Sequence, residues 1–261
     1  MRKISLDLEK EKIIGFIRDY VSSSGVRNGI VGISGGLDSA VTAALAAEAL
    51  GKEHVKGLML PYKKSNPDSL NDALTLADVL GIKHEIIDIT PVVDSWFDNY
   101  EPEASQLRRG NFMARIRMSI LYDISAKEDA LVLGTGNLSE LMIGYTTQYG
   151  DNACALEPIG HLYKTEVRKM ADKINIPAKI INKEPSADLW QGQTDEGELG
   201  LTYSNIDTIL YHYFEKDKSK EELVKAGLSP SDIDNVIKLH RKSHYKRELP
   251  PVPEPAKILE D

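Results

Sequence analysis

The chain has 261 residues and a formal net charge of −8. This length allows a buried hydrophobic core, and the charge is opposite in sign to the basic surface that nucleic-acid binding requires. No apolar run reaches the roughly 18 residues of a membrane-spanning helix, the N-terminal residues MRKISLDLEKEK contain no apolar signal core, and the one cysteine, Cys154, excludes an internal disulfide. We therefore expect a cytoplasmic protein with no nucleic-acid and no membrane partner.

Predicted helices and strands alternate through the first half of the chain. The first element is an amphipathic helix over residues 5–22, whose apolar face we assign to Leu8, Ile13, Ile14, Ile17 and Val21. The next elements are, in order, a strand over 28–33, a helix over 38–50, a strand over 55–60, a helix over 67–80, a strand over 83–89, a helix over 111–127, a strand over 130–135 and a helix over 137–143. This alternation predicts an α/β fold, a doubly wound parallel sheet flanked by helices.

The second half is predicted to be helical with long connections. Residues 144–163 show little periodicity, and a helix follows over 164–174. The segment 182–200 combines Pro, Gly and polar residues around one tryptophan, which is typical of an active-site covering loop, with simple disorder as the alternative. Further expected elements are helices near 203–215, 219–226 and 230–242 and a Pro-rich tail over 248–261. We expect one domain over residues 1–261 with a helical C-terminal segment.

The segment GISGGLDSAVTAAL, residues 32–45, predicts a phosphate-binding turn between the first strand and the next helix. Gly35 and Gly36 permit backbone angles that other residues avoid and allow a ligand to approach the backbone closely. Backbone amides and the positive end of the helix then form an anion site. The turn is not a Walker loop, because no lysine follows Gly36, and it lacks the third glycine of a dinucleotide fingerprint.

The sequence SGGLDS within this turn resembles the PP-loop of ATP pyrophosphatases, which cleave ATP between its α and β phosphates. Six further blocks follow in order: GNFMARIRM at 110–118, VLGTGNLSE at 132–140, YGD at 149–151, LYKTEV at 162–167, KEPSADLWQGQTDEGELG at 183–200 and YKRELPP at 245–251. Together they resemble ammonia-dependent NAD synthetase over nearly the whole chain. The resemblance implies an adenine nucleotide alpha hydrolase-like fold. It also implies a ligase reaction in which the deamido-NAD carboxylate attacks the α phosphorus of ATP, pyrophosphate leaves, and ammonia displaces AMP to give NAD.

The same resemblance assigns residues to the ATP side of the reaction. The implied ATP-binding residues are Gly32, Ile33, Ser34, Gly35, Gly36, Leu37, Asp38, Ser39, Leu60, Thr135, Lys164 and Ser186. Asp38 and Glu140 are the implied Mg²⁺ ligands and, with Lys164, the implied catalytic residues. The chemistry suits these residue types, since a departing pyrophosphate needs hydrogen-bond donors and a divalent cation to neutralise its growing charge.

On the other side of the reaction, the resemblance assigns substrate binding to Arg115, Gln148, Ala155, Tyr245 and Lys246. The chain departs from the family pattern here. The family commonly reads TKYGDGGxD where this chain reads TQYGDNACA, so Gln148 replaces a lysine and Ala155 an aspartate. A family HK pair becomes Tyr245 and Lys246, with His244 as a possible stand-in one residue earlier. With Gln148 in place of the lysine, the site has one cation fewer near its anionic substrate. A related adenylyl-forming amide ligase acting on a different carboxylate therefore stays open as an alternative function.

Three further expectations complete the sequence-based hypothesis. We expect Arg117 to form a surface ion pair, and Cys154 to be a small packed residue and not a glutaminase nucleophile, because no second domain of adequate length is present. Ammonia would then be free or delivered by a separate protein. The resemblance also implies a homodimer. A nucleotide-binding regulatory homologue without turnover is a second alternative, whereas tRNA modification is disfavoured by the acidic charge.

Overall fold

The computed structural model describes residues 2–186, 188, 190 and 192–253. Its centre is a four-stranded parallel sheet with the order β3-β2-β1-β4. The strands are β1 Asn28–Gly32, β2 Val55–Met59, β3 Lys83–Ile86 and β4 Ala130–Leu133. The chain builds outward from β1 to β3 and then returns to the other side of β1, so the carboxyl ends of β1 and β4 form a topological switch point. The doubly wound α/β prediction is confirmed.

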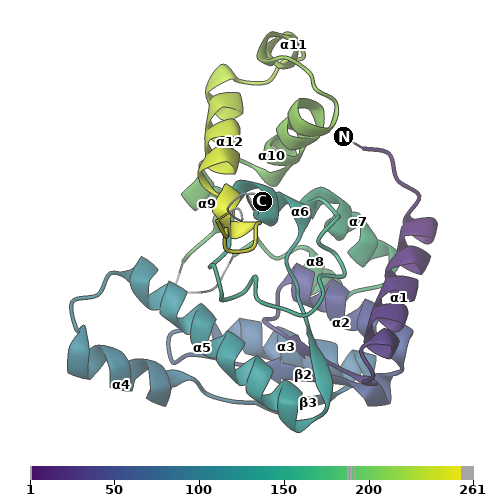
Figure 1. The fold of residues 1–261 in the computed structure, drawn as a ribbon, viewed down its shortest axis with the longest axis vertical. Helices are drawn as coiled ribbons and strands as arrows, with labels where there is room; N and C mark the ends of the chain where they lie inside the picture. Colours follow the sequence, from purple (N-terminus) through teal and green to yellow (C-terminus); the bar gives the residue numbers. More distant parts are fainter. Residues whose placement is uncertain (1, 187, 189, 191, 254–261) are drawn as a thin grey trace, which may run out of the picture.

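Both faces of the sheet are covered by helices (Figure 1). Neighbouring residues of a strand point to opposite faces, and Val31 belongs to the core on the side of α1, α2, α3 and α7, whereas Ile30 belongs to the core on the side of α4 and α5. The helices of this part are α1 Leu6–Ser23, α2 Leu37–Leu50, α3 Pro67–Leu80, α4 Thr90–Tyr100, α5 Gln106–Lys127, α6 Leu138–Ile143, α7 Lys164–Lys173 and α8 Ala178–Ile181, with a short 3-10 turn Lys52–His54 before β2.

The C-terminal helices form a third hydrophobic cluster at one end of the molecule, the top in Figure 1. Ile206, Ile209, Val236 and Ile237 are among its buried residues. The elements are α9 Asp195–Leu199, α10 Tyr203–Leu210 with a π-helical turn Tyr211–Glu215, α11 Lys220–Lys225, α12 Pro230–Lys242 and a 3-10 turn His244–Lys246. Because α10 also contacts α6 and α7, this cluster holds the helices that carry the polar network described below.

Several local predictions differ from the structure. Leu8 is 72% exposed, because a helical residue turns by about 100° and Leu8 therefore lies opposite Ile13, Ile17 and Val21. The predicted strand over 83–89 ends at residue 86, and the helix α4 that follows was not predicted. The helix α5 begins at Gln106 instead of 111, since the Ser105 hydroxyl caps it by accepting from the Arg108 N–H. The short α8 was missed as well.

Two predictions concern the ends and the membrane. The Pro-rich tail was predicted over 248–261, and its last residues, 254–261, lie outside the described part of the chain. Within the described residues, none of the helices combines the length and the apolar character needed to cross a bilayer.

Candidate active site

A cavity of about 530 Å³ opens at the carboxyl ends of β1, β2 and β4, as the topology predicts. Its walls come from α5, from the segment 182–200 and from the loop 34–39, the predicted phosphate-binding turn, which we call the phosphate loop. An adjoining recess shares Ser34, Asp38 and Lys164 with the cavity and continues past the start of α2 toward Lys183. Apolar strand ends therefore lie at one side of a continuous space, and the phosphate loop lies at the other.

The phosphate loop is held by its own serines and by close packing on α3. Gly35 has φ +75°, and a Cβ at this residue would lie 2.0 Å from the carbonyl oxygen of Ser69. Only glycine fits there. The Gly36 N–H donates to the Ser34 hydroxyl at 3.2 Å, and the Ser39 hydroxyl donates to the Gly36 carbonyl at 3.0 Å. The turn thus places its amides at the N-terminus of α2, where an anion is favoured.

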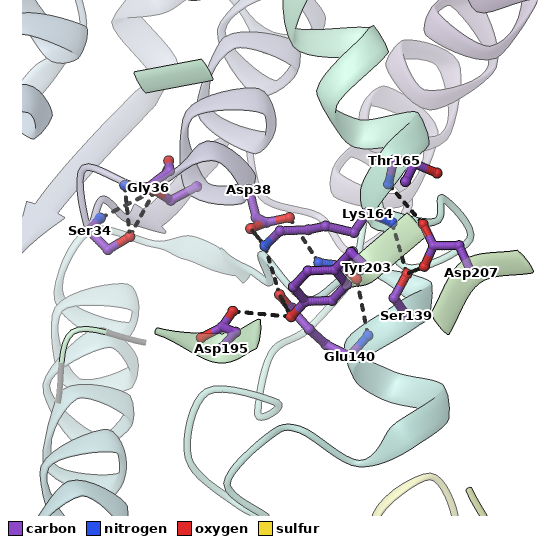
Figure 2. A network of polar contacts seen from close by, with 12 residues as sticks. Ser34, Gly36, Asp38, Ser139, Glu140, Lys164, Thr165, Asp195, Tyr203 and Asp207 are labelled. Atoms are coloured by element: carbon purple, nitrogen blue, oxygen red, sulfur yellow. Dashed lines mark hydrogen bonds and ion pairs between the residues drawn. The ribbon is translucent and has the colours of Figure 1, made fainter. Parts of the chain in front are cut away.

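Lys164 lies between the carboxylates of Asp38 and Glu140, as Figure 2 shows. Its Nζ is 2.5 Å from Asp38 Oδ2 and 2.9 Å from Glu140 Oε1. The three residues lie in the first turns of three different helices, α2, α6 and α7. Asn137 braces the group, since its side-chain amide donates to Asp38 and its side-chain oxygen accepts the Glu140 N–H. The structure therefore brings all three predicted catalytic residues together.

Burial and charge act against each other in this group. Burial raises the pKa of Glu140 to about 7, with Lys164 opposing the shift and Asp38 adding to it. Burial alone would lower the pKa of Lys164, but the two carboxylates outweigh it, so that the pKa is raised and the ammonium stays charged. A buried cation next to two acids is thus a permanent feature of the site at neutral pH.

The start of α7, which presents Lys164, is fixed by a second set of hydrogen bonds (Figure 2). The Lys164 N–H donates to the Ser139 hydroxyl at 2.8 Å, and the Thr165 N–H donates to Asp207 Oδ2 at 3.0 Å. The Ser139 hydroxyl in turn donates to Asp207 Oδ1 at 2.5 Å. Asp207 belongs to α10, so a C-terminal helix sets the position of the lysine in the cavity.

The network continues into α9 through Tyr203, a connection that was not predicted. The Tyr203 hydroxyl donates to Asp195 Oδ2 at 3.1 Å and lies 3.5 Å from Glu140 Oε1. The other oxygen of Asp195, Oδ1, is buried and has no hydrogen-bond partner among the described residues. Glu198 also lines the cavity and accepts from the Tyr145 hydroxyl at 2.6 Å. The block TDEGELG was the only sequence signal for these acids.

The donor set fits a magnesium ion that is also bound by phosphates. Asp38 and Glu140 supply carboxylate oxygens, the ligands that Mg²⁺ prefers, and both face the side of the cavity that holds the phosphate loop. No group of three His, Cys, Asp or Glu side chains that could hold a metal by itself occurs among the described residues. Protein ligands would thus complete only part of the octahedron, and phosphate oxygens and water would complete the rest.

Nearly all residues predicted to bind ATP lie around the cavity or the recess. Gly35 is the exception, because it packs against α3 behind the loop. The residues that line the space are Gly32, Ile33, Ser34, Gly36, Leu37, Asp38, Ser39, Leu60, Thr135, Lys164 and Ser186. Leu60 and Thr135 follow strands β2 and β4, so strand order alone brings them beside the phosphate loop.

The residues predicted to bind the second substrate are less closely grouped. The Nε of Arg115 donates to the Gln148 carbonyl at 3.2 Å, and the Gln148 amide lies 3.5 Å from the Tyr245 carbonyl. Lys246 lines the cavity, but its Nζ donates to the carbonyls of Gly144 and Thr146.

Two other residues of the altered blocks lie apart from this group. Ala155 packs against the hydrophobic core and donates its N–H to Val132, away from the residues with which it was predicted. His244 is exposed, and its ring faces Tyr245.

Arg117 corrects one prediction. It was expected in a surface ion pair, but it lines the cavity and donates its Nε to the Leu60 carbonyl at 2.9 Å. Burial lowers its pKa, with Asp188 and Asp151 opposing the shift. The helix α5 packs on the sheet with this side chain turned inward, whereas Arg115, two residues earlier, is exposed. Asp151, which accepts from the Thr147 N–H at 2.8 Å, is a further residue of the cavity wall that was not predicted.

Cys154 agrees with its predicted role as a packed residue. Its thiol lies 3.5 Å from Glu157 Oε1, and its sulfur is close to Gly134. Burial raises the pKa of the thiol, and the neighbouring Glu157 raises it further, so the thiolate needed for nucleophilic attack is not formed at neutral pH.

Comparison with known proteins gives consistent results. A family model described as NAD synthase matches residues 9–250. A protein from Fusobacterium nucleatum subsp. nucleatum, named NH(3)-dependent NAD(+) synthetase, is 47% identical over 252 residues, 96% of this chain and 97% of that protein. The structure of NMN synthetase from Francisella tularensis is similar with a TM-score of 0.86 at 32% identity, over 96% and 99% of the two chains. An NH3-dependent NAD synthetase from Campylobacter jejuni has a TM-score of 0.83 at 36% identity, over 97% and 100%.

Proposed function

The chain belongs to the NAD synthase family, and from this premise we propose that it is a ligase that uses ATP and ammonia to amidate deamido-NAD, giving NAD, AMP and pyrophosphate. The family predicted from the sequence blocks is thereby confirmed. The observation that carries the proposal is the meeting of Asp38, Glu140 and Lys164 beside the phosphate loop at the mouth of the sheet. These groups suit a reaction in which a phosphoanhydride bond breaks and charge builds on the leaving group.

ATP would lie along the continuous space. Its adenosine would occupy the apolar side formed by the strand ends, near Leu60 and Thr135, and its phosphates would meet the amides of the loop 34–39. Ser186 would contact the nucleotide from the segment 182–200, which we propose covers the site. The position of Ser186 on the walls of both cavity and recess supports this assignment.

In the first step, a carboxylate oxygen of deamido-NAD forms a bond to the α phosphorus of ATP while the bond between the α phosphorus and the bridging oxygen breaks. The electron pair leaves with pyrophosphate. Lys164 and the loop amides would stabilise that charge, because they border the recess before any nucleotide binds. Asp38 and Glu140 would hold Mg²⁺, which supplies further neutralisation of the phosphate charge when bound.

In the second step, the ammonia nitrogen attacks the carboxyl carbon of the adenylate, AMP leaves with the electron pair of the broken bond, and the nitrogen loses a proton as the amide forms. This chain supplies no glutaminase nucleophile, since the Cys154 thiol stays protonated. Ammonia therefore enters free or from a separate protein. We also propose a cytoplasmic location, where ATP, ammonia and deamido-NAD would all be present as metabolites.

We also propose a homodimer. The helices α4 and α5 expose large apolar side chains side by side: Trp96 is 44% exposed, Tyr100 69% and Leu107 62%. Leu107 also lines the cavity, so a partner on this surface would border the site. Light scattering of the purified protein should give twice the mass of the chain, and a monomer at micromolar concentration would contradict this part of the proposal.

The decisive assay measures pyrophosphate, AMP and NAD with ATP, Mg²⁺, ammonium and deamido-NAD. We expect the three products in equal amounts. Nicotinate mononucleotide serves as the comparison substrate, because the similar Francisella tularensis protein is named for NMN synthesis and a different carboxylate is the main alternative. No pyrophosphate above the substrate-free blank would overturn the proposal, and ATP binding without AMP formation would indicate a regulatory homologue.

A further inference from the structure

Lys183 connects three parts of the molecule that surround the phosphate side of the site. It lies at the start of the segment 182–200, and its Nζ is 3.0 Å from the Ser69 hydroxyl, 3.2 Å from Asp72 Oδ2 and 3.3 Å from the Gly35 carbonyl. Ser69 and Asp72 belong to the first turns of α3, and Gly35 belongs to the phosphate loop. The ammonium group of a residue in the covering segment therefore contacts both the phosphate loop and the helix behind it.

The contacts of this ammonium distinguish it from a phosphate ligand. A lysine ammonium has three N–H donors, and the three acceptors found here are all protein oxygens. Lys183 borders the recess, but its donors point behind the phosphate loop and not across it. Its effect on a bound triphosphate must then be indirect, through the backbone of the loop.

The Gly35 carbonyl is the key acceptor because of the geometry of the peptide unit. A trans peptide is planar, so its C=O and N–H point in opposite directions. Holding the Gly35 carbonyl toward Lys183 keeps the Gly36 N–H on the opposite side, where it meets the hydroxyl of Ser34 and the recess. Close packing of Gly35 on the Ser69 carbonyl leaves this peptide little room to rotate while Lys183 holds it.

Asp72 anchors Lys183, and a second lysine on the same carboxylate provides a control for the loss of charge. It is 4% exposed, and its second oxygen, Oδ1, accepts from Lys179 at 2.7 Å. Lys179 is 67% exposed and contacts the same carboxylate, but no contact with the phosphate loop is found for it among the described residues. Loss of either lysine removes one positive charge and leaves Asp72 one partner, so the two variants differ in the contacts that only Lys183 makes, with Gly35 of the loop and with Ser69.

The covering segment is tied at both ends. The Asp195 N–H donates to the Pro185 carbonyl at 2.9 Å, which joins the two ends of the segment. Asp195 accepts from Tyr203, next to Glu140, while Lys183 contacts the phosphate loop. A shift of Lys183 would therefore affect the loop that binds phosphates before it affects the acids.

We propose that Lys183 is a positioning residue for ATP, which fixes the Gly35–Gly36 peptide and so keeps the Gly36 N–H and its partner, the Ser34 hydroxyl, at the recess where the phosphates would bind. This inference rests on the proposed function only in that the loop binds ATP. The test compares Lys183→Met with Lys179→Met in the full chain. Loss of charge-assisted hydrogen bonds should raise the KM for ATP about tenfold in Lys183→Met, with kcat at saturating ATP and the KM for deamido-NAD within about twofold of the parent.

Two control variants test whether the loss of the loop contact causes the effect. Lys179→Met should leave the KM for ATP within about twofold, and Lys183→Arg should recover part of the loss, because a guanidinium can reach the same oxygens. Equal effects of Lys183→Met and Lys179→Met would overturn the proposal, as would a loss confined to kcat. If Lys183→Met does not fold, Ser69→Ala removes one acceptor of the same link and should raise the KM for ATP about fivefold; a KM within about twofold of the parent would contradict the link.

A binding measurement separates this proposal from the proposed function. Calorimetry with a non-hydrolysable ATP analogue and Mg²⁺ requires no turnover. Weaker binding to Lys183→Met than to Lys179→Met supports the positioning role even if the parent makes no NAD. Equal binding to both variants refutes the role even if the parent is fully active.

Discussion

The residues assigned to the phosphates and the residues assigned to the second substrate form two sides of the candidate site that are built differently. On the phosphate side, Lys164 is buried, the side chains of Asp38 and Glu140 are 16% and 15% exposed, and contacts at 2.5 and 2.9 Å join the lysine to them. On the side assigned to the second substrate, Arg115 and Tyr245 are exposed and do not line the cavity, and contacts run to backbone carbonyls at 3.2 and 3.5 Å. Removing one partner from a buried charged group leaves an unpaired charge, which is costly. We therefore expect the group around Lys164 to keep its arrangement, and the exposed residues on the other side to adjust more easily to a partner or a substrate.

The largest expected effect is on the phosphate side. Lys164→Met removes the cation between two buried carboxylates, so we expect pyrophosphate release to fall by about a thousandfold and the free energy of unfolding to fall by about 3 kcal/mol. Steady-state kinetics and denaturant unfolding measure the two changes. Lys169→Met, on an exposed part of the same helix, is the control and should change neither. Activity within tenfold of the parent would remove Lys164 from the mechanism.

The two arginines of α5 test the division between the sides directly. Arg117 lies in the cavity against Leu60, so Arg117→Met should raise the KM for ATP about tenfold. Arg115 contacts Gln148, so Arg115→Met should instead raise the KM for deamido-NAD by about the same factor. Initial rates with each substrate varied in turn separate the effects. If both variants raised the same KM, the two sides would not be independent.

A smaller effect is expected from restoring a cation on the open side. Gln148→Lys returns the residue found in the common family pattern and adds a positive charge near an anionic substrate. We expect the KM for deamido-NAD to fall about threefold at low salt, with the benefit lost as ionic strength rises. Lys246→Met supplies a comparison, since it removes a cation from the cavity wall. An unchanged KM at every salt concentration would place residue 148 outside substrate binding.

The smallest effect concerns Cys154. Burial raises the pKa of its thiol, so the neutral thiol is the form present from pH 6 to about pH 9, and thiolate appears only above that range. Alkylation by iodoacetamide at pH 8 should be slow in the folded protein and fast after unfolding. Cys154→Ser should keep activity within about twofold. Rapid alkylation of the native protein with loss of ammonia-dependent activity would show an accessible thiolate instead.

Much of the fold could be predicted because it rests on local patterns. The strand before the phosphate loop, the helix after it and the helices α3, α7 and α12 follow from hydrophobic periodicity within one or two residues. The helix α8 was missed because it has only four residues. The helix α4 was missed although it has 11 residues, because it exposes Val92, Trp96 and Tyr100 as well as burying Val93 and Phe97, so that no clear apolar face marks it in the sequence. Leu8 shows the same limit, since apolar character did not reveal which way it faces.

The sequence by itself determined the family, and it predicted a phosphate loop at 34–39 and site roles for Asp38, Glu140 and Lys164, because these depend on residue types at short spacing and on blocks in order. Only the tertiary structure decided that Arg117 faces the cavity and that Ala155 does not. It also decided that Tyr203 and Asp195 extend the acidic network and that Lys183 holds the phosphate loop from behind. The physical reason is that a side chain acquires a partner or a burial only when distant segments pack together.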